Sequence, residues 1–281
     1  MDIDLNAKIN IQYDKSYVAF LDVLGFKNLV SSSKKSDKNK LDQYFGVVNS
    51  AIDYLSQIQS KQQIGIGSII ISDSVILSVP MGQDANDNLY RLRHLCVAVG
   101  IIQQFLAIKD IWLRGAISYG NTYFDSVKSQ VVGPAYINAY LLEENTAVWP
   151  RVILDSKIIE ELEFQSATQF IDAMNQSDNG GMHFENWGSS ILYSWRYPDG
   201  KNVTLIEQDV ALFIDYLSPI VEKNGKNLLR IIKNVEQNLY KDTKLYKKFR
   251  WIADYLRSIC ERECKNDNII KSEAHFRLDN L

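Results

Sequence analysis

The chain has 281 residues, of which 46% are hydrophobic and 23% are charged, and its formal net charge is −3. This composition is typical of a globular protein with a sizeable core, and the length suits one large or two small domains. The acidic balance argues against broad, sequence-independent binding to nucleic acid, which needs a basic surface. An anionic substrate is compatible with this charge, because bound metal ions dominate the electric field around them.

The N-terminal residues and the cysteines favour a cytoplasmic protein. The first residues are acidic and no apolar core follows them, so a signal peptide is not expected. The most apolar run, residues 95–108, is shorter than the roughly 20 residues of a membrane helix. Cys96, Cys260 and Cys264 match no metal-binding pattern, and we expect buried or idle thiols in a reducing compartment. We therefore expect no membrane and no nucleic acid among the partners.

Hydrophobic periodicity predicts six elements in chain order, separated by polar or glycine-containing loops. They are a strand at 17–22, a helix at 41–55, two strands at 69–71 and 75–77, a helix at 89–106 and a strand at 112–119. The order strand, helix, strand, strand, helix, strand is that of the ferredoxin-like βαββαβ arrangement. We therefore predict an α+β fold in which helices back an antiparallel sheet.

The remainder of the chain is predicted to be rich in helices. A helix beginning near Pro134 and a strand at 152–154 close the first domain, which we expect to span residues 1–155. Residues 156–281 form a C-terminal extension, in which two apolar stripes predict helices. Five basic residues near the second stripe are interpreted as a solvated helix face. They are Lys241, Lys244, Lys247, Lys248 and Arg250.

Two aspartates stand where predicted strands end. Asp22 follows a buried strand, and Asp73 lies at the tip of the hairpin between the second and third strands. In a ferredoxin-like sheet the first and third strands are central neighbours, so both carboxylates should meet at one rim. Taken singly, each is explained as a strand-end or turn residue. As a pair they can hold two divalent cations about 4 Å apart, as a two-metal nucleotidyl-transfer site requires.

Short segments around these aspartates resemble the catalytic domain of class III nucleotidyl cyclases. Residues 20–26 resemble the first metal-binding motif, and Asp73 falls where the second metal aspartate belongs. Residues 113–120 resemble the strand that follows the second core helix. Residues 133–140 resemble the segment with the ribose-orienting asparagine, here Asn138. The resemblance implies a class III cyclase core that covers the predicted first domain.

Within that class, the resemblance is greatest to the bacterial pyrimidine cyclases of Pycsar antiphage defence. Residues 17–27 and 113–118 carry it, together with the helical extension. It implies conversion of UTP or CTP to 3′,5′-cyclic UMP or cyclic CMP and pyrophosphate. It also implies a homodimer with its sites at the subunit interface, and a downstream effector that the diffusible product switches on.

The resemblance further implies two divalent cations per site, Mn²⁺ or Mg²⁺. Asp22, Asp73 and the backbone carbonyl of Val23 would hold them. One cation would lower the pKa of the ribose 3′-hydroxyl, and the other would hold the triphosphate. Attack on the α-phosphorus must be in line with the departing pyrophosphate.

Phosphate binding is expected at the turn that follows the first strand. Backbone N–H groups of Leu24, Gly25 and Phe26 can cradle phosphate oxygens, since glycine permits a close approach. Lys27 either adds positive charge there or is a solvated lysine. Arg114 either reaches the phosphates as a catalytic cation or anchors the edge of the sheet.

Other positions bear on the ribose and the base. Asn138 either orients the ribose across the dimer interface or is a helix-surface amide. Where related purine cyclases carry an adenine-reading lysine, this chain has Ile69, and the partner position falls near Val131. An apolar pair cannot satisfy the hydrogen-bonding edge of adenine, which favours UTP or CTP without distinguishing them. Tyr44 either narrows the pocket for a single-ring base or packs in the core.

One departure from the class leaves two hypotheses open. Leu142 stands where purine cyclases carry the arginine that stabilises the transition state, so either Arg114 or Arg151 replaces it or turnover is slow. The same departure supports a catalytically silent cyclase-like sensor that binds a nucleotide and signals through its helical tail. A diguanylate cyclase or polymerase palm is disfavoured, because residues 71–74 lack the Gly-Gly-acidic or paired-aspartate turn of those enzymes.

Overall fold

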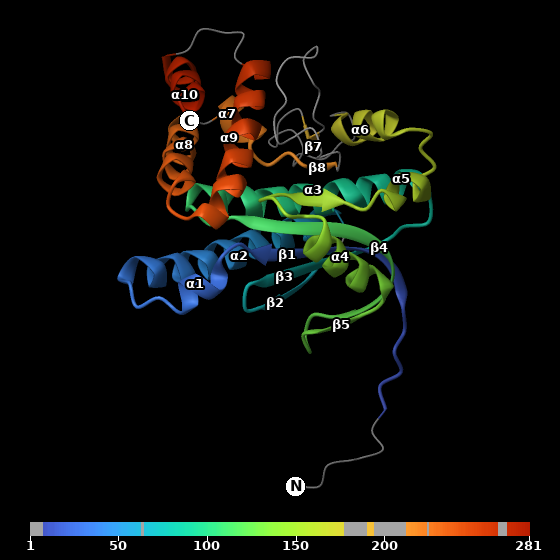
Figure 1. Cartoon of the computed structure of the whole chain (residues 1–281). Helices are drawn as coiled ribbons and strands as arrows, with labels where there is room; N and C mark the ends of the chain where they lie inside the picture. The colour runs from blue at the N-terminus through green and yellow to red at the C-terminus, as the bar shows by residue number, and fades with distance from the viewer. Residues whose placement is uncertain (1–7, 63–64, 177–189, 194–211, 224, 264–268) are drawn as a thin grey trace.

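The computed structural model describes residues 8–62, 65–176, 190–193, 212–223, 225–263 and 269–281. Its strands form a mixed sheet in the order β2-β3-β1-β4-β6-β8-β7, with β5 paired to β4 (Figure 1). The strands are β1 (Asp14–Val23), β2 (Gly67–Ile71), β3 (Ser74–Pro80), β4 (Leu113–Asp125), β5 (Gln130–Val132), β6 (Val152–Leu154), β7 (Leu192–Tyr193) and β8 (Phe213–Ile214).

Helices lie on both faces of this sheet and at one end of it. They are α1 (Phe26–Val30), α2 (Lys35–Gln62), α3 (Ala85–Ile108), α4 (Pro134–Asn145), α5 (Lys157–Glu161), α6 (Ala167–Asn175), α7 (Ser218–Lys223), α8 (Gly225–Leu239), α9 (Thr243–Glu263) and α10 (Ile269–Asp279). In Figure 1 the helices α7 to α10 stand together at one end of the sheet.

The predicted α+β fold and its βαββαβ order are confirmed. The order β1-α2-β2-β3-α3-β4 follows the prediction, and β1 lies between β3 and β4 with antiparallel pairing on both sides. The predicted strand at 152–154 is β6. The expected loop before the first helix is partly wrong, because α2 already begins at Lys35. The short helix α1 was not predicted.

Alternation along β1 divides the core into two layers. Tyr17, Ala19 and Leu21 face α2 and α3 in the largest hydrophobic cluster. Val18 and Phe20 face the other way, where they pack against α4. Because successive strand residues point to opposite faces, Asp22 belongs to the α4 face.

The C-terminal extension is built into the same sheet. Strand β8 pairs with β6, and β7 continues the sheet beyond it. One buried cluster contains Trp112, Ala116 and Ile153 from the first part of the chain, together with the apolar faces of α8 and α9. The domain boundary near residue 155 stays a prediction, but the two parts share a sheet and a hydrophobic core.

The cysteines and the most apolar helix have core positions. Cys96 and Cys260 are buried free thiols, whereas Cys264 lies outside the described residues. In the described part of the chain, α3 is long and apolar enough to cross a membrane by length and composition alone. However, 72% of its most apolar window is buried inside the protein, so the helix serves as the core helix of the sheet.

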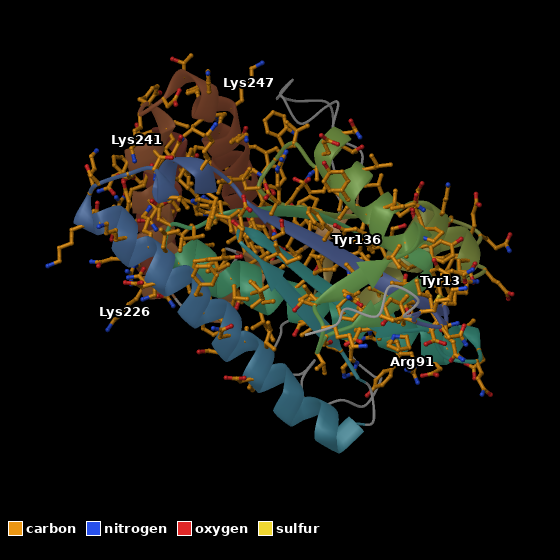
Figure 2. All side chains as sticks on the ribbon, turned by 90° about the horizontal axis from the view of Figure 1, so that it is seen from below. Tyr13, Arg91, Tyr136, Lys226, Lys241 and Lys247 are labelled. Carbon is orange, nitrogen blue, oxygen red and sulfur yellow. The ribbon has the colours of Figure 1, made fainter. Side chains whose placement is uncertain are left out.

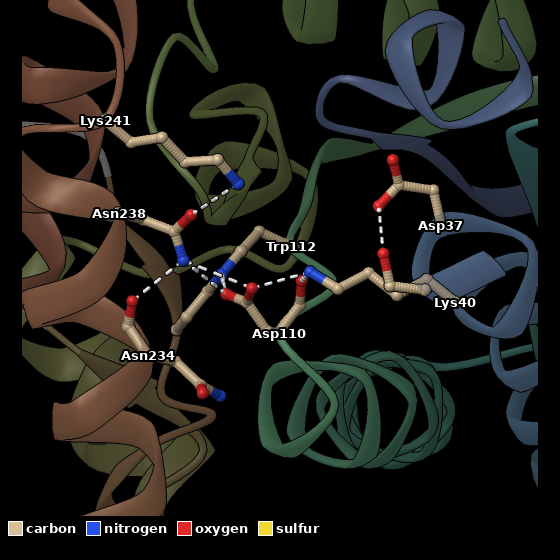
Figure 3. A network of polar contacts seen from close by, with 8 residues as sticks. Asp37, Lys40, Asp110, Trp112, Asn234, Asn238 and Lys241 are labelled. Carbon is tan, nitrogen blue, oxygen red and sulfur yellow. Dashed lines mark hydrogen bonds and ion pairs between the residues drawn. The ribbon is translucent and has the colours of Figure 1, made fainter. Parts of the chain in front are cut away.

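A polar network centred on Asp110 fastens α8 to the core (Figure 3). The Asp110 carboxylate accepts hydrogen bonds from Trp112 Nε1 at 3.0 Å and from Asn238 Nδ2 at 3.0 and 3.1 Å. It also forms an ion pair with Lys40 of α2 at 2.6 Å. One carboxylate thereby connects α2, the start of β4 and the last turn of α8.

We expect Asn238→Ala to lower the free energy of unfolding by about 2 kcal/mol, because Asp110 loses a donor in a half-buried setting. Urea denaturation of the purified variant measures this change. Asn234→Ala is the matched control. Asn238 contacts Asn234 at its backbone carbonyl, which this substitution keeps. Equal losses in the two variants would contradict a specific role for the network.

Candidate active site

The carboxylates of Asp22 and Asp73 come together at one rim of the sheet. Asp22 pairs with Ser74 across the β1–β3 ladder, so the hairpin turn lies beside the end of β1. The N–H of Val23 donates a hydrogen bond to the carbonyl of Asp73 at 3.2 Å, which fastens the turn in place. Burial raises the pKa of Asp22, and the neighbouring charge of Asp73 raises it further.

Arg114 lies between Asp22 and a second acidic residue, Glu143 of α4. Its Nε is 3.5 Å from Asp22 Oδ2 but only 2.6 Å from Glu143 Oε1. Asp22 and Arg114 are direct partners across the β1–β4 ladder, which places both on the α4 face. Because the shorter contact is with Glu143, and 21% of the Asp22 side chain is exposed, Asp22 keeps room for another ligand.

Glu143 is a buried acid that sequence reasoning missed. Only 4% of its side chain is exposed, and burial raises its pKa to about 7 although Arg114 opposes the shift. The sequence feature that could have pointed to it is an acidic residue in α4, directly after Leu142, the position at which a cation was expected. Its position shows that Arg114 is held from two sides, by α4 and by β1.

Lys248 of α9 completes the group of charges, also against expectation. Its side chain is half-buried. Burial lowers the pKa of its ammonium group, and the positive charge of Arg114 lowers it further. Asp22 and Glu143 are near enough to oppose that shift. Reading the whole basic run as a solvated face was therefore wrong for this residue. The spacing from Leu245 could have indicated this, because residues three apart share a helix face and Leu245 belongs to the apolar stripe of α9.

A pocket of about 440 Å³ lies beside the turn that follows β1. Leu24 and Gly25 line it from the turn, and Lys248 and Phe249 line it from α9. Other charged residues around it are Lys34, Asp37, Lys40, Asp110, Lys241 and Asp242. The C-terminal extension therefore forms part of the wall next to the two carboxylates.

The turn itself supports part of the predicted phosphate cradle. Gly25 has φ 76°, a left-handed conformation that favours glycine, and no atom lies within 4 Å of the position of a Cβ. The N–H of Leu24, however, donates to the carbonyl of Trp112 at 2.8 Å. The expectation that this N–H binds phosphate is corrected, and the cradle is limited to Gly25 and Phe26.

The donor set at the rim fits a hard divalent cation. Among the residues described, no group of three or more His, Cys, Asp and Glu side chains could hold a metal ion. A cation held by Asp22 and Asp73 would therefore need further ligands besides these two carboxylates. Mg²⁺ is commonly bound by one or two carboxylates together with water and substrate phosphates. The participation of the Val23 carbonyl stays a prediction.

The predicted base-contacting residues are enclosed by the protein. Tyr44 is fully buried, with its ring against Phe26 and Phe45, and its hydroxyl has no hydrogen-bond partner. Ile69 is only 2% exposed. Neither side chain is open to solvent in this arrangement. Their contact with a base stays a prediction. Lys27 is exposed to solvent.

Among the described residues, neither Asn138 nor Arg151 has a contact with the two carboxylates. Asn138 is half-buried on α4, and the contacts described for this chain do not include one between it and Asp22 or Asp73. Arg151 is buried against the extension, where its guanidinium lies 5.5 Å from the centre of the Phe213 ring. This packing removes Arg151 from the candidate cations for the site.

No family model matches the chain, and no curated protein matches it. Among solved structures, the adenylyl cyclase CyaB from P. aeruginosa has a TM-score of 0.37 and 14% identity, over 55% of this chain and 83% of that one. The guanylyl cyclase Cya2 has a TM-score of 0.37 and 12% identity, over 73% and 93% of the two chains.

A third similar structure is a class III adenylyl cyclase-like ATP-binding protein from Pseudomonas aeruginosa. Its TM-score is 0.38 at 8% identity, over 56% of this chain and 36% of that one. Likenesses this low bear neither on substrate nor on activity, and no family is assigned from them.

The raised pKa of Glu143 predicts a pH dependence of stability. The folded chain binds this proton more tightly than the unfolded chain, whose pKa is near 4.5. The contribution is therefore fully present below about pH 4.5 and is lost as the pH rises through about 7. Glu143→Gln removes it, so the variant should gain up to about 3 kcal/mol relative to wild type between these limits.

Urea denaturation at pH 5, 6, 7 and 8 measures both proteins. Glu144→Gln, at the exposed neighbouring position, should keep the wild-type slope of stability against pH. Parallel curves for wild type and Glu143→Gln would show that Glu143 titrates normally.

Proposed function

We propose that this chain is a nucleotidyl cyclase that converts UTP or CTP to 3′,5′-cyclic UMP or cyclic CMP and pyrophosphate. The observation that carries the proposal is the meeting of Asp22 and Asp73 at a partly exposed rim, where Arg114 is 3.5 Å from Asp22 and leaves part of that carboxylate open to a ligand. The repulsion within such a pair is relieved when a cation binds between the two carboxylates. The pocket beside it has lysines from both parts of the chain.

Bound Mn²⁺ or Mg²⁺ would activate the ribose 3′-hydroxyl and neutralise charge on the phosphates. Asp22 and Asp73 would hold these two cations. In the reaction a bond forms between O3′ and the α-phosphorus, the bond from that phosphorus to the pyrophosphate breaks, and the hydroxyl proton passes to solvent. Arg114 keeps positive charge at the rim, and the N–H groups of Gly25 and Phe26 can receive phosphate oxygens.

The choice of a pyrimidine rests on the sequence resemblance. By that resemblance Ile69 stands at the position that reads adenine in purine cyclases, and an isoleucine there would offer no polar group to a purine edge. Such a purine would lose hydrogen bonds that it makes in water, which disfavours binding. The same resemblance supports a role in antiphage defence in the cytoplasm, in which the cyclic product reaches a downstream effector.

A homodimer with shared sites is supported by α4. Ile137, Tyr140 and Leu141 are large apolar side chains on this helix, and each is at least 40% exposed. Asn138 lies among them without a described contact to Asp22 or Asp73 of its own chain. A second copy packed on α4 would cover the apolar residues and would let Asn138 orient a ribose held by its partner.

A catalytically silent nucleotide sensor is the second candidate. It is favoured by Leu142, which packs against the cluster shared with the extension instead of providing a cation. Arg114 is also held by Glu143. A sensor would bind a nucleotide with metal but would release no pyrophosphate.

Incubation with each of the four NTPs and Mn²⁺, followed by mass analysis, tests the proposed activity. We expect a cyclic pyrimidine nucleotide and its equivalent of pyrophosphate. Asp73→Asn should abolish both, because the metal site loses a ligand charge. Asp53→Asn, an exposed position on α2, should keep full activity. Metal-dependent nucleotide binding without any product would favour the sensor instead.

Mixing two inactive variants tests the shared site. We expect Asp73→Asn and Asn138→Ala homodimers each to be inactive or nearly so. After subunit exchange at equal amounts, half of the dimers are mixed and each has one intact site, so about a quarter of wild-type activity should return. A lack of recovery, despite mixed dimers detected by native mass spectrometry, would place Asn138 outside the partner's site.

A further inference from the structure

The position of α9 follows from contacts next to the rim. Phe249 packs edge-on against Trp112, with ring centres 6.0 Å apart and planes at 90°. The carbonyl of Trp112 accepts the N–H of Leu24, within the turn that follows β1. An aromatic contact and a hydrogen bond thus link α9 directly to that turn. Lys248, which precedes Phe249 in the helix, is brought to the same pocket as Leu24.

The end of α8 fixes the same region independently. Asn238 donates to the Asp110 carboxylate, which also bonds the side chain of Trp112 (Figure 3). The chain then turns into α9 after only a few residues, so the start of α9 has little freedom to move away. Trp112 is therefore held through its ring, its indole N–H and its carbonyl, and the pocket wall is pre-formed on the extension's side.

Lys248 differs from the other lysines of its helix. Lys244 and Lys247 are exposed, and Figure 2 shows Lys247 projecting away from the body of the protein. Lys248 is half-buried, and among the described residues no carboxylate is near enough to form an ion pair with it. Asp22 and Glu143 influence it only at longer range. A half-buried ammonium group without a close counter-ion favours the arrival of an anion.

Arg114 is less suited to that task, because Glu143 already occupies its Nε at 2.6 Å. Lys40, in the same pocket, forms an ion pair with Asp110. Leu142, at the position where a cation is expected from the class, is apolar. Lys34 and Lys241 also line the pocket, but both are exposed to solvent. Of Arg114, Lys40 and Lys248, Lys248 is the half-buried cation without a close carboxylate among the described residues.

We propose that the C-terminal extension completes the candidate active site, with Lys248 of α9 binding the triphosphate of the substrate. This inference rests on the proposed function, since it assigns one contact within the same site. The extension then supplies the cation that α4 lacks, and it acts in substrate binding in addition to any signalling. A flexible ammonium group can follow the phosphate oxygens as charge moves toward the leaving pyrophosphate.

Calorimetric titration of the full chain with inorganic tripolyphosphate in the presence of Mn²⁺ tests this contact without requiring turnover. We expect Lys248→Gln to weaken binding at least about tenfold, because a charge-assisted hydrogen bond is lost. Lys247→Gln, on the adjacent exposed position, should bind within about twofold of wild type. Lys248→Arg should recover part of the affinity, and thermal unfolding checks that each variant is folded.

The outcomes separate this inference from the proposed activity. Equal binding by wild type and Lys248→Gln, or no tripolyphosphate binding by wild type, would overturn the role of Lys248. Cyclic product formed equally well by wild type and Lys248→Gln would overturn it too, while leaving the proposed cyclase in place. A Lys248-dependent binding of tripolyphosphate without cyclic product from any NTP would retain the phosphate site and remove the cyclase.

Discussion

Repulsion between two neighbouring carboxylates is the constraint on which the rest of the site depends. Strand pairing fixes the backbone of Asp22, and a backbone hydrogen bond from Val23 holds the turn that carries Asp73, so the two residues stay side by side at the rim. The close packing of β4 on β1 next to Asp22 also restricts which residues fit there. At Gly115 a Cβ would lie 2.4 Å from the carbonyl oxygen of Phe20, so only glycine lets β4 approach β1 there. The fold therefore bears an electrostatic cost that bound cations would relieve.

The surrounding charges limit that cost without removing the site. Arg114 is near both Asp22 and Glu143, but its shorter contact is with the buried glutamate. Glu143 thus keeps the arginine on the α4 side of the rim and leaves Asp22 partly exposed. Lys248 approaches the group from α9. Elements distant in sequence, namely β1, β4, α4 and α9, contribute alternating charges at one place, which fits a site for a negatively charged ligand and cations together.

The sequence predicted the parts of this arrangement that depend on local periodicity. Buried strands and amphipathic helices between residues 17 and 119 followed from spacing, and the rim position of Asp22 and Asp73 followed from their order. What it did not reveal depends on tertiary packing. The burial of Glu143 requires α4 to lie on β1 and β4, and the inward direction of Lys248 requires α9 to pack on Trp112. Periodicity alone cannot say against which element a helix face is packed.

Anomalous X-ray scattering from crystals grown with Mn²⁺ and tripolyphosphate tests most directly whether the carboxylate pair is a cation site. Manganese peaks within coordination distance of both Asp22 and Asp73, with phosphate oxygens completing the shell, are the expected result. Manganese bound elsewhere, or an ordered rim in which Arg114 closes on Asp22 and no metal is present, would show that the two aspartates serve the fold alone.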